Sequence, residues 1–536
     1  MAAVYPSRLK MFLAARASQA THKRLRFALG IVNPMNSATD LHHADFRAPP
    51  DADRAREAIG RLRASLPAHC VLYRDEDKRP YECDALSAFR QMPMAVVLPE
   101  TEAQVIEVLR TCRALDVPVV ARGAGTSLSG GSMPHASGVV LSLARFNRIL
   151  SLDPHARIAR VQPGVRNLAV SEAAAPHGLY YAPDPSSQIA CSIGGNVAEN
   201  SGGVHCLKYG LTVHNVLRLR VVTIDGEVLE IGSEALDSPG LDLLALLIGS
   251  EGMLAVVTEV TVKLLPRPQL ARAALASFDD IIKAGDAVAA IIAEGIIPAG
   301  MEMMDRKTTR AVEPFVKAGY DLEAEAILIV ESDGTPEEVE EEIARIDAVL
   351  ARCGCTALRV SQNETERLAF WSGRKNAFPA AGRISPDYYC MDGTIPRRML
   401  GRMLEAIAGM ERKYDLGCMN VFHAGDGNLH PLILFDANNP DSWHRAELFG
   451  AEILELCVEY GGTVTGEHGV GVEKLSSMCV QFSPDERAMF FAVKHAFDAA
   501  GLLNPGKGIP TPSRCAEYGK MHVHRGLLPF ADLPRF

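Results

Sequence analysis

The sequence lacks a pair of cysteines at the spacing of a metal knuckle or a redox motif. Its twelve cysteines are scattered along the chain, and the closest pair, Cys353 and Cys355, does not form a CxxC. A disulfide framework or an iron-sulfur cluster therefore has no local signature. This cysteine usage is typical of a protein from a reducing cytoplasm.

Long apolar runs and an excess of positive charge are also missing. The richest apolar stretch, Leu243 to Ile248, is far shorter than the roughly 18 residues that span a bilayer. We therefore expect no transmembrane helix, and any association with the inner membrane should be peripheral. The formal net charge is -10, whereas phosphate backbones bind clustered Lys and Arg, so we expect no nucleic-acid partner. A small molecule is the predicted ligand.

Acidic residues are absent from the first 39 positions, which hold several Lys and Arg. This pattern could indicate an organelle transit peptide, but a disordered leader or a start codon placed too early also explains it. We favour the leader and place it at residues 1–45.

The chain has 536 residues, more than the roughly 250 to 300 at which one hydrophobic core stops growing, so we expect two domains. Short apolar segments and turn residues predict an α/β or α+β first half, which ends at Pro266 and Pro268. Its predicted strands are 95–98, 117–120, 138–143, 158–162, 217–224 and 254–265, with a helix from Thr101 to about Leu115.

Longer amphipathic helices are predicted in the second half. Thr335 and Glu338 have the spacing of a capping box, with Pro336 at the first helical position. Apolar residues follow at helical spacing as far as Leu350. We therefore expect a separate α+β domain.

A glycine-rich loop, Arg122 to Gly131, directly follows a predicted strand. Its glycines can turn successive backbone N–H groups towards a pyrophosphate, although a simple tight turn uses the same residues. A Rossmann motif would need a helix next, but a strand is predicted there, which argues against NAD. A Walker loop is excluded because no GK[ST] closes the motif.

Two later segments add backbone donors and small polar side chains without bulk. One runs from Pro183 to Gly203, and the other is Gly249-Ser250-Glu251-Gly252. Together with the first loop they indicate an extended cofactor that carries phosphates.

The C-terminal half contains two glycine-flanked histidine motifs. His423 and His430 lie at the ends of a predicted hairpin turn, and Glu467-His468 follows later. Two imidazoles and a carboxylate with an open position suit a catalytic divalent ion, Zn or Fe/Mn. Each histidine alone would more often be a turn or core residue, but two glycine-flanked histidine motifs in one domain favour a functional site.

A cation for a substrate carboxylate is available in Trp371-Ser372-Gly373-Arg374-Lys375. A guanidinium can hold both carboxylate oxygens at once, which lysine cannot do. Arg374 is therefore a candidate for binding a carboxylate, and Lys375 is equally well explained as a surface charge.

The three loops resemble the FAD-binding half of the vanillyl-alcohol oxidase and p-cresol methylhydroxylase superfamily. The resemblance implies non-covalent FAD, because Thr126 stands where covalent members often carry histidine. It assigns these cofactor-binding positions: Arg122, Gly123, Ala124, Gly125, Thr126, Gly130, Gly131, Pro183, Ser187, Ser192, Gly194, Gly195, Asn196, Asn200, Gly202 and Glu251. Asn504, in a closing motif, is expected near the flavin.

The C-terminal motifs resemble those of the FAD-linked 2-hydroxy-acid dehydrogenases, and the whole pattern is most similar to the glycolate oxidase branch. The resemblance implies His423, His430 and Glu467 as metal ligands, His468 as the base and Arg374 as the substrate anchor. It also implies an FAD-binding domain over 46–267, a substrate or cap domain over 268–505 and a tail over 506–536.

By this resemblance the chain oxidises glycolate, and also D-lactate, to the 2-oxo acid. Electrons would pass to a second FAD-binding subunit, an iron-sulfur subunit and quinone. Leu432 and Cys390 replace polar residues of the 2-hydroxyglutarate enzymes, which favours a short substrate. The alternatives are a stand-alone D-lactate or D-2-hydroxyglutarate dehydrogenase, a metallohydrolase, and a non-catalytic FAD-carrying subunit.

Overall fold

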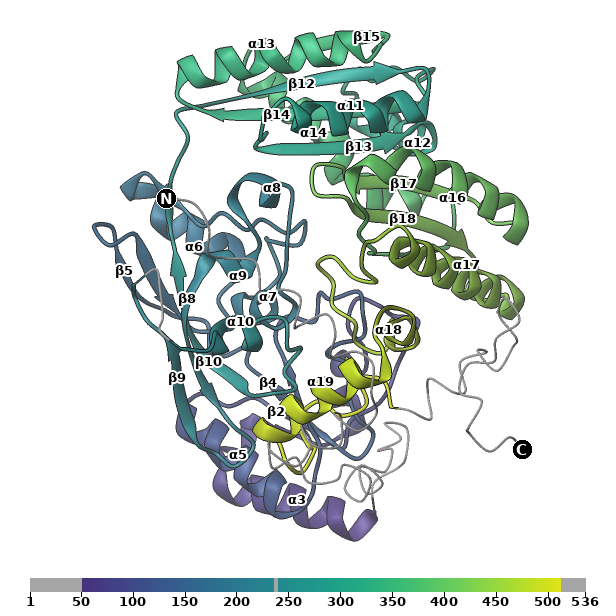
Figure 1. Ribbon diagram of the computed structural model, residues 1–536. Coiled ribbons are helices and arrows are strands. Elements are labelled where there is room, and N and C mark those ends of the chain that lie inside the picture. Colours follow the sequence, from purple (N-terminus) through teal and green to yellow (C-terminus); the bar gives the residue numbers. More distant parts are fainter. Residues whose placement is uncertain (1–50, 236–239, 512–536) are drawn as a thin grey trace, which may run out of the picture. The chain divides into compact units, whose positions relative to one another are not determined.

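The computed structural model describes residues 51–235 and 240–511 (Figure 1). All of these residues belong to one compact unit. The predicted leader and most of the predicted tail lie outside the described residues. Within the described ranges, no helix is long and apolar enough to cross a membrane.

The first sheet has four strands in the order β1-β2-β4-β3. Strands β2, β4 and β3 run parallel, and β1 pairs antiparallel with β2. Their bounds are Val71–Leu72 (β1), Ala95–Val97 (β2), Val119–Arg122 (β3) and Val139–Ser142 (β4). Helix α5, Glu102–Ala114, begins at the predicted cap Thr101, whose hydroxyl accepts from the Gln104 amide. Its apolar face and helix α3, Ala52–Ser65, cover this sheet.

The second sheet is antiparallel, with the order β5-β6-β10-β8-β9. The bounds are Ile149–Asp153 (β5), Ile158–Val161 (β6), Val216–Val222 (β8), Val228–Gly232 (β9) and Val256–Lys263 (β10). Helices α6, Asn167–Ala174, and α7, Ile193–Glu199, pack their buried residues on it. The predicted strand 254–265 is divided, because Leu265–Pro266 (β11) leaves β10 and pairs with Leu179–Tyr180 (β7). Shorter helices in this half are α4, Asp75–Lys78; α8, Cys206–Tyr209; α9, Thr212–Asn215; and α10, Leu243–Leu247.

The third sheet contains seven antiparallel strands in the order β15-β12-β14-β13-β17-β18-β16. The bounds are Leu270–Phe278 (β12), Gly300–Asp305 (β13), Ala326–Gly334 (β14), Ala357–Val360 (β15), Asp387–Cys390 (β16), Cys418–His423 (β17) and Asn428–Phe435 (β18). Helices cover both faces, so nearly every residue of the inner strands β13, β14 and β17 is buried. Along β14, Leu328 and Val330 enter one core, and Ile327 and Ile329 enter the other.

One face of this sheet is covered by α11, α13, α16 and α17, and the other by α12, α14 and α15. The bounds are Ile281–Ala293 (α11), Arg306–Val316 (α12), Pro336–Arg352 (α13), Glu364–Lys375 (α14), Ala377–Ala381 (α15), Leu400–Tyr414 (α16) and Pro440–Glu459 (α17). Both arms of the predicted capping box are present in α13, between Thr335 and Glu338.

The last described segment packs on the first half of the chain. Helices α18, Leu475–Gln481, and α19, Pro484–Phe497, lead to Leu503, which forms a parallel bridge with Val119. Val493 and Phe497 pack against the core of the second sheet. The predicted domain limits stay a prediction. Residues 484–503, which were predicted to belong to the second domain, pack on the first half of the chain.

Candidate active site

A cavity of about 410 Å³ lies between the glycine-rich segments and the histidine motifs. Residues 121–128 and 131–132, residues 185–201 and residues 247–257 each contribute to its wall. From the second half of the chain come Lys375, Phe378, Pro379, His430, Glu467 and His468. The structure therefore brings the predicted phosphate-binding loops and the predicted metal site to one cavity.

The glycine loop follows β3 and reaches β4 with no helix in residues 123–138, all of them described. This agrees with the argument against a Rossmann motif. Gly125 has φ +72°, and a Cβ there would meet the Arg122 guanidinium at 2.2 Å. That guanidinium donates to the Cys83 carbonyl at 2.8 Å. Arg122 is thus packed beneath the loop, and only glycine fits above it.

Most predicted cofactor positions line the cavity, and five do not: Gly130, Pro183, Asn200, Gly202 and Asn504. Two of the five support its wall. The Asn504 amide donates to the carbonyls of Gly131, at 3.0 Å, and Glu251, at 2.6 Å. Asn200 ends α7 in the left-handed conformation and accepts from the Val213 amide.

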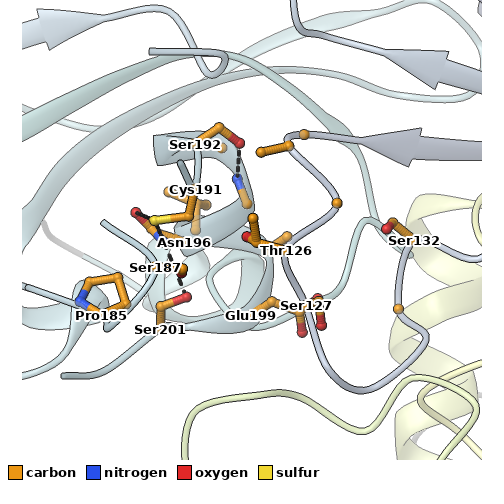
Figure 2. Close-up of a pocket in the computed structure, with 18 of the residues that line it drawn as sticks. Thr126, Ser127, Ser132, Pro185, Ser187, Cys191, Ser192, Asn196, Glu199 and Ser201 are labelled. Carbon is orange, nitrogen blue, oxygen red and sulfur yellow. Dashed lines mark hydrogen bonds between the residues drawn. The ribbon is translucent and has the colours of Figure 1, made fainter. Parts of the chain in front are cut away.

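Several polar wall residues were not among the individually predicted cofactor-binding positions. Figure 2 shows Ser127, Ser132, Glu199 and Ser201 among the side chains around the cavity. Glu199 has one buried oxygen without a hydrogen-bond partner. Burial, assisted by the neighbouring Glu251, raises the pKa of Glu199 well above its ordinary value. The signal for these residues is only their place inside the glycine-rich segments.

The predicted hairpin is formed by β17 and β18, with His423 paired opposite Asn428 and His430 opposite Val421. Glu467 lies in the loop before α18. Its Oε1 is 3.2 Å from His423 Nε2 and 3.0 Å from His430 Nε2. Both histidines are buried, with exposed fractions of 4% and 2%. The three predicted metal ligands are therefore together, with their ligand atoms within 4.8 Å of one another.

The charges around Glu467 suit a cation. Although burial raises the pKa of Glu467, His423 and His430 hold it well below its ordinary value. Burial opposes protonation of His423, but Glu302 and Glu467 raise its pKa well above the usual range. A buried carboxylate beside two imidazole Nε2 atoms is the donor set of an open divalent site. The residues present therefore fit the implied metal.

The predicted base, His468, stacks on His430 with ring centroids 5.0 Å apart and planes 11° apart. Burial lowers the pKa of His468 to about 4, despite the opposing charge of Asp392. This imidazole is consequently neutral at physiological pH, as a proton acceptor must be.

Glu302, on β13, is a further residue that the sequence did not reveal. It is fully buried, and its carboxylate accepts from His423 Nδ1 and from Arg374 Nε. Such a bond fixes the tautomer of a ligating histidine and leaves Nε2 for the metal. The only local signal is a carboxylate among the apolar residues of an inner strand.

Arg374 is placed beside this cluster and does not line the cavity. It is 2% exposed, and one guanidinium nitrogen lies 3.5 Å from His423 Nε2. Its neighbour Lys375, for which the sequence equally allowed a role as a surface charge, is exposed and lines the cavity.

Two family models match the chain: an FAD binding domain over residues 93–232, and the C-terminal domain of FAD linked oxidases over residues 267–508. The chain is 63% identical over 489 residues to the glycolate oxidase subunit GlcD of Escherichia coli (strain K12). The aligned residues cover 91% of this chain and 98% of that protein. The chain belongs to the FAD-linked oxidases.

This FAD-linked oxidase has further relatives. It is 40% identical to glycolate oxidase subunit GlcD of Bacillus subtilis (strain 168), over 80% of this chain and 91% of that protein. It is 29% identical to a D-lactate dehydrogenase of Anaerostipes hadrus, over 82% of this chain and 94% of that protein.

Solved structures confirm the predicted fold class of this FAD-linked oxidase. p-Cresol methylhydroxylase with substrate bound matches with a TM-score of 0.73 at 18% identity, over 86% of this chain and 98% of that one. 4-Ethylphenol oxidase from Gulosibacter chungangensis matches with a TM-score of 0.72 at 19% identity, over 87% of this chain and 100% of that one. At such identities the likeness concerns the fold alone.

Proposed function

We propose that this FAD-linked oxidase is a dehydrogenase of glycolate and D-lactate, which it converts to the 2-oxo acids. In this reaction the 2-hydroxyl loses a proton and C2 loses a hydride. FAD, bound non-covalently, supplies the hydride acceptor at N5, and a divalent ion, Zn or Fe/Mn, supplies a Lewis acid for the hydroxyl. His423, His430 and Glu467 would hold the ion, and His468 would accept the hydroxyl proton.

The observation that carries this proposal is the shared cavity. Its wall includes the glycine loop from one half of the chain and His430, Glu467 and His468 from the other. A substrate there would meet a neutral imidazole next to a metal-binding carboxylate. A metallohydrolase would have no use for the three glycine-rich segments, and the FAD binding domain match argues against it as well.

The choice of a short substrate is supported by Cys390 and Leu432. These residues are paired between β16 and β18, and both are buried in an apolar cluster. Cys390 also lies beside His430 and His468. Neither Cys390 nor Leu432 carries a positive charge that could pair with the second carboxylate of a long diacid, and an unpaired buried charge is costly. This disfavours 2-hydroxyglutarate.

The substrate carboxylate is assigned to Arg374. Its partner Glu302 already aligns the guanidinium, which is close to His423. The substrate would have to reach this group past the metal ligands, and exposed Lys375 offers a second cation at the cavity wall. The two assignments can be separated by mutation.

The electrons would leave through partner proteins. Relatives at 63% and 40% identity are named as subunits of glycolate oxidase. We therefore infer that this chain works with a second FAD-binding subunit and an iron-sulfur subunit in the cytoplasm, peripherally at the inner membrane, and passes electrons towards quinone. Co-purification of the tagged full chain from its own cells tests this inference.

The proposed activity is tested by anaerobic absorbance titration of the purified, FAD-loaded chain. Glycolate and D-lactate should bleach the flavin bands, and D-2-hydroxyglutarate and L-lactate should not. Bleaching by D-2-hydroxyglutarate or by D-lactate alone would favour a stand-alone dehydrogenase of that acid. Flavin that no 2-hydroxy acid reduces would identify a non-catalytic FAD-carrying subunit and reject the proposal.

A further inference from the structure

The loop that carries Glu467 and His468 is hydrogen-bonded to one buried carboxylate, that of Asp392. Asp392 follows β16, and its side chain is fully buried. The backbone N–H groups of Glu467 and His468 donate to it at 3.1 and 3.0 Å. The Gly466 N–H donates to it at 3.1 Å and also to the Asp392 carbonyl at 2.7 Å. Three consecutive N–H groups around one anion form a nest, and here the anion belongs to the chain itself. Asp392 therefore fixes the backbone direction of these residues.

The same carboxylate also holds the hairpin that carries the two histidine ligands. Asn428, at the start of β18, donates its side-chain amide to Asp392 Oδ1 at 3.0 Å. Gly466 lies so close that a Cβ would be 1.5 Å from Asn428 Nδ2. Asp392 thus joins the loop of Glu467 to the hairpin of His423 and His430.

Lys474 balances the buried charge. Its Nζ lies 3.0 Å from Asp392 Oδ2 and donates to the Gly469 carbonyl at 3.0 Å and to Thr465 Oγ1 at 3.3 Å. Lys474 has no exposed surface. Removing Lys474 alone would leave the buried charge of Asp392 uncompensated, and removing Asp392 alone would leave Lys474 with only Glu473, at 3.6 Å, whereas removing both partners is often tolerated. This asymmetry allows the role of the ion pair to be separated from the role of the nest.

We propose that Asp392 is a positioning residue, which sets where Glu467 and His468 lie relative to His423 and His430. It does not line the cavity and acts through the loop backbone. A carboxylate offers only acceptors, which suits three N–H donors and one amide. Asparagine would direct its own NH2 group at one of those donors. The inference rests on the proposed function in one respect, because the roles of Glu467 as metal ligand and His468 as base come from that proposal.

The test compares the full FAD-loaded chain with three variants: Asp392→Asn, Lys474→Met and the double variant with both changes. Melting temperature reports stability, and Zn²⁺ titration after chelation reports metal affinity. Amide hydrogen exchange of residues 466–468 reports the nest directly. Asp498→Asn is the matched control, since Asp498 is also a buried partner of a lysine, Lys494, and accepts from the Leu503 amide.

Asp392→Asn should lower the melting temperature, weaken Zn²⁺ binding by roughly 10- to 100-fold and speed exchange at 466–468. The double variant should regain stability but neither metal affinity nor protection from exchange. Asp498→Asn should lose stability only. If the double variant recovers all three properties, Asp392 is merely the counter-ion of Lys474 and the proposal is wrong.

The exchange measurement also separates this proposal from the proposed function. A wild-type chain that binds no Zn²⁺, Fe²⁺ or Mn²⁺ would reject the metal site. Protection at residues 466–468 would still decide the role of Asp392, because it requires neither metal nor turnover. Unchanged protection in the double variant would overturn the inference even if the enzyme oxidises glycolate.

Discussion

His430 and His468 lie nearly parallel, with ring centroids 5.0 Å apart. One ring points Nε2 at Glu467 Oε1, and the other has a lowered pKa and lines the cavity. A proposed metal ligand and the proposed base are thus in direct contact. A substitution that displaces either His430 or His468 should therefore also shift the other ring.

Glu302→Gln should weaken metal binding. Glutamine keeps the size of Glu302, but its NH2 group would face either His423 Nδ1–H or the Arg374 guanidinium, both of which are donors. The substitution also removes the negative charge that pairs with Arg374. We expect roughly 10- to 100-fold lower Zn²⁺ affinity in titration calorimetry. Asp305→Asn is the control, because this buried carboxylate on the same strand accepts from Thr308 and Asn420 instead. Equal affinities in wild type and Glu302→Gln would contradict the role given to Glu302.

Arg374→Lys should raise KM for glycolate by roughly 10- to 100-fold, because lysine cannot hold both carboxylate oxygens. Steady-state kinetics with an artificial electron acceptor would measure this. Lys375→Met is the comparison, since Lys375 lines the cavity and Arg374 does not. A rise in KM only for Lys375→Met would transfer the carboxylate-binding role to that residue.

Glu473 should make the stability of the protein depend on pH. Burial raises the pKa of Glu473 to about 7, despite Lys474 at 3.6 Å. Between about pH 4.5 and pH 7 the folded state holds this proton and the unfolded state does not, so stability falls as pH rises. The loss should approach about 3 kcal/mol above pH 7.

The Glu473→Gln variant tests this dependence by chemical denaturation at about pH 5 and about pH 8. Glutamine cannot ionise, so its free energy of unfolding should change less between the two pH values. The variant should also be more stable than wild type at the higher pH. Identical pH slopes in the two proteins would show that Glu473 does not carry the effect.

Local signals explain what the sequence could reveal. The capping box at Thr335, the hairpin between His423 and His430 and the glycine loop after β3 all depend on residues a few positions apart. The order of three cofactor segments and the match of the C-terminal motifs to a family then predicted the fold class and the metal ligands. These features needed no knowledge of tertiary contacts.

The residues that sequence reasoning missed act over long separations. Glu302 meets His423 across neighbouring strands β13 and β17, and Asp392 meets a loop more than seventy positions later. Neither stands in a spacing that reports its partner. The depth of Arg374 was likewise unpredictable, because burial at the end of α14 depends on packing against the third sheet.

The central claim is that the histidine site acts on a substrate held next to FAD. Anaerobic stopped-flow mixing with glycolate tests it most directly, in wild type, chelated protein, His468→Ala and the exposed-histidine control His444→Ala. We predict rapid flavin reduction in wild type and His444→Ala. A loss of roughly 10²- to 10⁴-fold is expected in His468→Ala, and chelated protein should recover when the ion returns. Normal flavin reduction in either His468→Ala or the chelated protein would contradict the account.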